Sequence, residues 1–133
     1  MKTSDKNQEF DADPKRSPTE ALRQFWAFQT QPNMVSMARM WIEVFAHAQH
    51  RRPHTSSFFE TFDKAWTHAF TKIAMSAGDS PAVAKVDACV ALAVMRGLYI
   101  DFLATGDRAG VDKSKERFMQ MYEMLLLSRN NKS

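Results

Sequence analysis

The sequence predicts an all-α protein, a bundle of five helices, and three observations support this fold class. Ala, Met and Leu are common, and runs that alternate β-branched with polar residues are absent, which favours helices over a sheet. Apart from Pro14 in the N-terminal tail, the few glycines and prolines fall at expected helix ends or inside helices. Ser17 and Ser57 each precede a Glu by three residues, which is the capping-box spacing at the start of a helix.

The first two expected helices are separated at Pro32. The first is capped by Ser17, has Pro18 in its first turn and runs to about Gln29. The second runs from Pro32 to about Gln49 and is expected to be largely buried, because its apolar stripe is broad. Its apolar residues are Met34, Val35, Met37, Ala38, Met40, Trp41, Ile42, Val44, Phe45 and Ala48.

A break at residues 51–54 precedes the third expected helix, because Pro53 disfavours helical geometry in the residue before it. We expect this helix to begin at the Ser57 capping box and to run to about Ala77, where Gly78 ends it. Its inner side is apolar and its outer side polar. The inner residues are Phe58, Phe62, Ala65, Trp66, Ala69, Phe70 and Ile73.

The fourth expected helix, from Ser80 to Gly106, is the element around which the rest is organised. It is apolar on two sides at helical spacing. One side holds Val83, Val86, Val90, Val94 and Gly97, and the other holds Ala88, Leu92, Met95, Tyr99 and Phe102. A helix that is apolar on two sides must be covered on two sides. We therefore expect one side to pack in its own domain and the other against a second subunit.

The last expected helix is capped by Asp112 and runs to about Ser128, with apolar residues at Phe118, Met121, Tyr122, Leu125 and Leu126. We expect one helical domain over residues 17–128, since 133 residues suit a single core. Residues 1–16 are expected to be a flexible polar tail and residues 129–133 a disordered C-terminus, because these ends carry little apolar surface.

Charge and cysteine content limit the function classes. The formal net charge of +3 is small and the basic residues are scattered, so no nucleic-acid partner is expected. Cys89 is the single cysteine, and we expect it to be buried as a small hydrophobic residue in a reducing cytoplasm. The longest apolar stretch is interrupted by Lys85, Asp87, Arg96 and Asp101. A soluble cytoplasmic protein without a membrane span or secretory signal is therefore expected.

A capped proline start, an alanine-rich apolar helix, the segment MRGLYIDFLATGD and a short loop into a last apolar helix follow one another from Ser80 to Leu127. This order resembles the C-terminal domain of the tetracycline-repressor (TetR) family. Residues 17–78 are consistent with the aromatic-rich helices that precede it in that family. Its members begin with a helix-turn-helix domain, whereas a polar tail precedes Ser17 here, so we expect no operator binding by this chain alone.

The resemblance implies a homodimer in which the last two helices, residues 80–106 and 112–128, pair with their copies in a four-helix bundle. Small residues on the fourth helix, such as Ala93 and Gly97, would allow the helices to approach closely. The interface residues that it implies are Val86, Val90, Val94, Gly97, Phe118, Tyr122, Leu125 and Leu126.

The resemblance also implies a cavity for a small apolar effector. The candidate lining residues are Met37, Trp41, Phe45, Phe62, Trp66, Met95 and Tyr99. Adaptable methionines and aromatic residues with one polar group suit such a pocket. The alternative is that these residues simply fill the core.

No catalytic, cofactor or metal site is expected. Phosphate-binding loops, a serine nucleophile elbow and a cysteine with an evident base are missing from the sequence. His47, His50 and His54 are close in sequence, but Arg51 and Arg52 would repel a cation.

The leading hypothesis is a TetR-like ligand-binding and dimerisation domain of a transcriptional regulator, without its own DNA-binding domain. It would sense a small apolar molecule or modulate a full-length TetR-type regulator by heterodimerisation. The alternative is a helical protein–protein interaction module with a filled core and no ligand.

Overall fold

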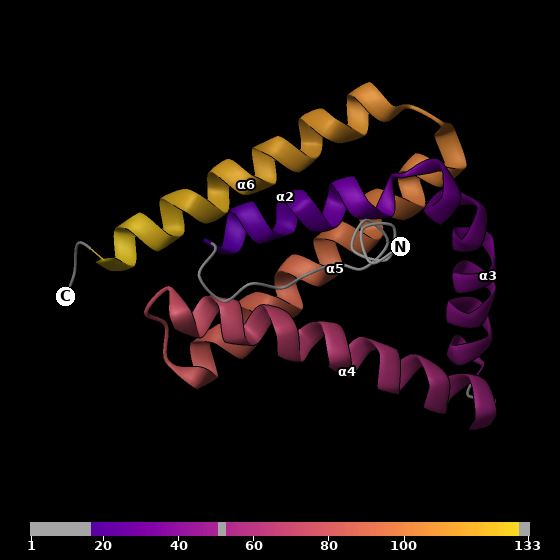
Figure 1. Cartoon of the computed structure of the whole chain (residues 1–133), viewed down its shortest axis with the longest axis horizontal. Helices are drawn as coiled ribbons and strands as arrows, with labels where there is room; N and C mark the ends of the chain where they lie inside the picture. The colour runs from indigo at the N-terminus through magenta and orange to yellow at the C-terminus, as the bar shows by residue number, and fades with distance from the viewer. Residues whose placement is uncertain (1–16, 51–52, 131–133) are drawn as a thin grey trace, which may run out of the picture. The chain divides into compact units, whose positions relative to one another are not determined.

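A computed structural model describes residues 17–50 and 53–130, and within these ranges the fold is all-helical, as predicted. The helices shown in Figure 1 are α2 (Pro18–Gln29), α3 (Pro32–Gln49), α4 (Pro53–Ser76), α5 (Pro81–Thr105) and α6 (Arg108–Asn130). The predicted tail at residues 1–16 and the last three residues of the predicted disordered C-terminus lie outside the described residues. The side chains of residues 39, 48, 53–59, 62 and 63 also lie outside the description.

Local sequence signals position the ends of α2 as predicted. The Ser17 backbone is extended, and its hydroxyl oxygen accepts a hydrogen bond from the Glu20 amide at 3.2 Å. Pro18 occupies the first turn, where its missing N–H leaves no bond unmade. At the other end the Thr30 hydroxyl donates to the Trp26 carbonyl oxygen at 2.8 Å, and the same oxygen also accepts the Thr30 amide at 3.0 Å. The hydroxyl also lies 3.4 Å from the carbonyl oxygen of Ala27, which belongs to the last turn.

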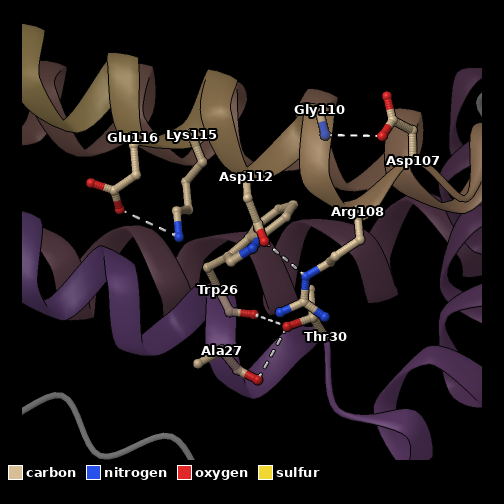
Figure 2. A network of polar contacts seen from close by, with 9 residues as sticks. All are labelled: Trp26, Ala27, Thr30, Asp107, Arg108, Gly110, Asp112, Lys115 and Glu116. Atoms are coloured by element: carbon tan, nitrogen blue, oxygen red, sulfur yellow. Dashed lines mark hydrogen bonds and ion pairs between the residues drawn. The ribbon is translucent and has the colours of Figure 1, made fainter.

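Two helix starts differ from the prediction. The helix α4 begins at Pro53 rather than at the Ser57 capping box, because proline is well suited to the first turn of a helix. The helix α6 begins at Arg108 rather than at Asp112. Its cap is Asp107, whose Oδ1 accepts a hydrogen bond from the Gly110 amide at 2.9 Å, as Figure 2 shows. Asp112 instead pairs with Arg108 one turn earlier, at 3.3 Å.

Glycine ends α4 and α5 as predicted. Gly78 has a φ of 110°, and the flanking amide of Asp79 donates to the Ala74 carbonyl oxygen at 3.3 Å. Together with the bond from the Gly78 amide to the Met75 carbonyl at 3.0 Å, this is a Schellman motif. Gly106, with a φ of 70°, follows the last residue of α5. Both glycines adopt left-handed backbone geometry that costs other residues energy.

The chain forms two compact units that divide within α5, the first extending to Leu92 and the second beginning at Ala93. In the first unit α2, α3 and α4 pack against one another. Its buried apolar residues on these helices are Ala21, Leu22, Phe25, Trp26, Ala38, Phe70, Ile73 and Ala74. The second unit holds the end of α5 and all of α6, with Met95, Tyr99, Val111, Met119 and Tyr122 buried. The single domain over residues 17–128 stays a prediction.

The expectation that the second helix is largely buried is wrong. In α3 Ala38 is the one described residue that is fully buried, while Met37 and Met40 are 56% and 61% exposed. The physical reason is that α3 packs on α2 and α4 with part of its circumference, so the rest of its broad apolar stripe faces outward.

By length and composition α5 could cross a membrane. The central helix of a soluble protein passes the same test, so this observation is weak evidence for a span.

Candidate functional site

The two apolar sides of α5 differ in how far they are buried within the chain. Ala84, Ala88, Met95 and Tyr99 are each 5% exposed or less. On the opposite side Val83, Val86 and Val90 are 38%, 62% and 52% exposed. Val94 is half-buried and Gly97 exposed. We call Val83, Val86, Val90, Val94 and Gly97 the valine face. One buried and one exposed apolar side agree with the sequence pattern. What would bury the exposed side stays a prediction.

The valine face is continuous along the helix. Its members are three or four residues apart, which keeps them on one side of α5 over about 21 Å. Contiguous apolar surface on a folded protein commonly marks an interaction site. The valine face is therefore a candidate interaction surface.

Gly97 adds a second argument for close approach at this face. Outside its chain neighbours and the backbone of its own helix, a Cβ atom at Gly97 would meet no atom within 4 Å, and the φ of Gly97 lies outside the left-handed region. Neither space nor backbone geometry in the single chain therefore requires glycine here. Glycine inside a helix costs about 0.5–1 kcal/mol relative to alanine. A glycine at this position would allow the backbone of a neighbouring helix to approach more closely than a larger residue would.

The implied interface residues of α6 lie on more than one side of that helix. Tyr122 is 7% exposed and packs near Phe118, with ring centroids 6.1 Å apart, whereas Leu125 is 44% exposed. Phe118 and Leu126 are half-buried. Other exposed apolar residues near Leu125 are Met121 at 61%, Met124 at 70% and Leu127 at 62%. The sequence reasoning left these methionines out of the interface, although the spacing of Met121, Met124 and Leu125 could have indicated a shared side.

In the first unit the predicted lining residues form two groups. Trp41 and Phe45, one turn apart on α3, are stacked with centroids 5.8 Å apart and planes at 16°. Both are half-buried, and the exposed Met37 lies one turn earlier. The Phe62 side chain lies outside the description. The α3 residues thus offer a flexible methionine next to a partly open aromatic pair, which suits contact with an apolar molecule.

Trp66 belongs to an aromatic cluster between α2 and α4. Its ring meets Phe25 edge-on, with centroids 4.6 Å apart and planes at 62°. Phe70 meets Phe25 in the same way at 5.5 Å. Phe25 and Phe70 are 5% and 4% exposed and belong to the core of the first unit, whereas Trp66 is half-buried. The sequence pattern places Phe70 on the inner side of its helix but does not pair it with Phe25, since their contact depends on how α2 packs on α4.

The two remaining predicted lining residues, Met95 and Tyr99, lie in the second unit and are 0% and 5% exposed. Burial raises the pKa of the Tyr99 phenol, so this side chain is neutral at physiological pH. Its ring lies 6.4 Å from that of Phe102, and the Arg108 guanidinium lies 5.8 Å from the centre of the Phe102 ring. These contacts connect the end of α5 to the start of α6.

Cys89 is exposed, which corrects the expectation that it is a buried hydrophobic residue. The reason is the rotation of α5, which turns Cys89 toward the margin of the valine face and away from the buried side. His47 and His50 are also exposed. Among the described residues no group of three or more His, Cys, Asp or Glu side chains is placed to hold a metal ion.

Comparison with protein-family models, curated proteins and solved structures gives no match for this chain. The resemblance to the TetR C-terminal domain therefore stays an expectation from the sequence.

Proposed function

We propose that residues 17–128 form the ligand-binding and dimerisation domain of a transcriptional regulator of the TetR type. Two copies associate through α5 and α6 as a four-helix bundle, and the preceding helices receive a small apolar molecule. The observation that carries the proposal is the valine face, which lies uncovered on the side of α5 opposite its buried side.

Energy arithmetic supports the participation of both helices. Full burial of one valine contributes about 1.5–3 kcal/mol, so covering half-exposed Val86 and Val90 in two copies contributes roughly 3–6 kcal/mol. Association costs about 4 to 15 kcal/mol in lost freedom of motion. The two valines therefore do not suffice for a stable dimer. The proposal therefore requires further apolar area, and Met121, Met124 and Leu125 are exposed apolar residues of α6.

The proposed dimer is tested with the double variant Val86→Glu and Val90→Glu. Both positions are exposed in the single chain, so the helix should form as before, while four like charges should oppose pairing. The matched control is Met40→Glu on α3, whose side chain is 61% exposed against 62% for Val86.

Light scattering after size exclusion should give a dimer mass for the unsubstituted chain and the control, and a monomer mass for the double variant. Circular dichroism should show equal helix content in all three. A monomeric unsubstituted chain, or a double variant that remains dimeric, would contradict the proposal.

The ligand-binding part rests on the partly open pair Trp41 and Phe45 and on the exposed Met37 beside them. A molecule that binds only the folded chain raises its melting temperature. We expect at least one member of a panel of apolar compounds to raise the melting temperature of the unsubstituted chain. The shift should be reduced in Trp41→Ala and retained in Met75→Ala, which removes an exposed apolar side chain from α4. A panel without any shift would contradict this part while leaving the dimer untouched.

The valine face would equally serve a mixed dimer with a full-length TetR-type regulator. Such a dimer would contain a single DNA-binding domain if the second chain supplied none. Because operators are commonly bound through two half-sites, the mixed dimer would bind its operator more weakly. Co-expression with full-length regulators and isolation of complexes tests this version. Recovery of self-dimers alone would count against it.

The second candidate function is a helical interaction module without a ligand. The aromatic contacts among Phe25, Trp66 and Phe70 favour it, because these rings pack directly against one another. The compound panel separates the two candidates, since a module with a filled core should show no ligand-dependent melting shift.

A further inference from the structure

We draw no further inference here: the strongest candidate, the exposed Cys89 thiol at the margin of the valine face on α5, is a lone cysteine beside the surface already described, and nothing else in the described part of the chain indicates a ligand or a modification there.

Discussion

The two sides of α5 are similarly apolar in sequence, but one is covered within the chain and the other is not. Met95 on the inner side is fully buried, whereas Val86 and Val90 on the outer side are more than half exposed. The inner side contributes to the stability of a single chain. The outer side contributes only when something else covers it, so substitutions on the two sides should affect different measurements.

The largest expected effect is on the inner side. Met95→Ala removes a side chain with no exposed surface, and it should lower the free energy of unfolding by about 2–5 kcal/mol through lost burial and the cavity left behind. Val90→Ala on the outer side should lower it by less than about 1 kcal/mol, because the valine is half in water and alanine favours the helix. Urea denaturation at low protein concentration measures both. Equal losses would contradict the difference between the sides.

A smaller effect with opposite signs in two measurements is expected at Gly97. Gly97→Ala should raise the stability of the single chain by about 0.5–1 kcal/mol, because the new methyl group meets nothing and the helix becomes less costly to form. The same methyl group should weaken self-association if a neighbouring helix approaches here. Denaturation and sedimentation of one variant therefore report separately on the chain and on its pairing. Association that is unchanged would place the contact away from Gly97.

The smallest effect is confined to alkaline solution and concerns Tyr99 on the inner side. Burial raises its pKa above the ordinary value of 10.0, so the folded chain holds the phenol proton more tightly than the unfolded chain. The resulting stability is present below pH 10.0 and is lost as the pH rises through the raised pKa. Tyr99→Phe keeps the ring and removes the proton, so its unfolding free energy should fall less between pH 9 and pH 11. An identical fall in both proteins would show that Tyr99 ionises freely.

The sequence was sufficient where a local signal is unique. Ser17 and Gly106 fix helix ends through hydrogen bonds and backbone geometry that involve only neighbouring residues. It was insufficient where two signals compete within a few residues, as with Asp107 and Asp112 at the start of α6. Each aspartate could serve as a cap, and the choice depends on where the preceding loop ends.

Burial was predictable only as a pattern. The two apolar sides of α5 follow from helical spacing, but the exposure of Cys89 depends on how the whole helix is rotated in the fold. The contact of Phe25 with Trp66 depends on the packing of α2 against α4, which no local pattern specifies. The exposure of apolar residues on α3 was also not predictable, because the width of an apolar stripe does not determine how much of it the neighbouring helices bury.

Cys89 allows the most direct test of the claim that the outer side of α5 meets its copy, because it is the only cysteine, is exposed and lies at the margin of the valine face. A spin label on Cys89 should give an intermolecular distance on the order of 20–40 Å by double electron–electron resonance, since paired helices of this length bring such positions together. The signal should vanish when the labelled chain is diluted with an excess of the Cys89→Ser chain. The absence of any intermolecular distance in the undiluted protein would contradict the claim.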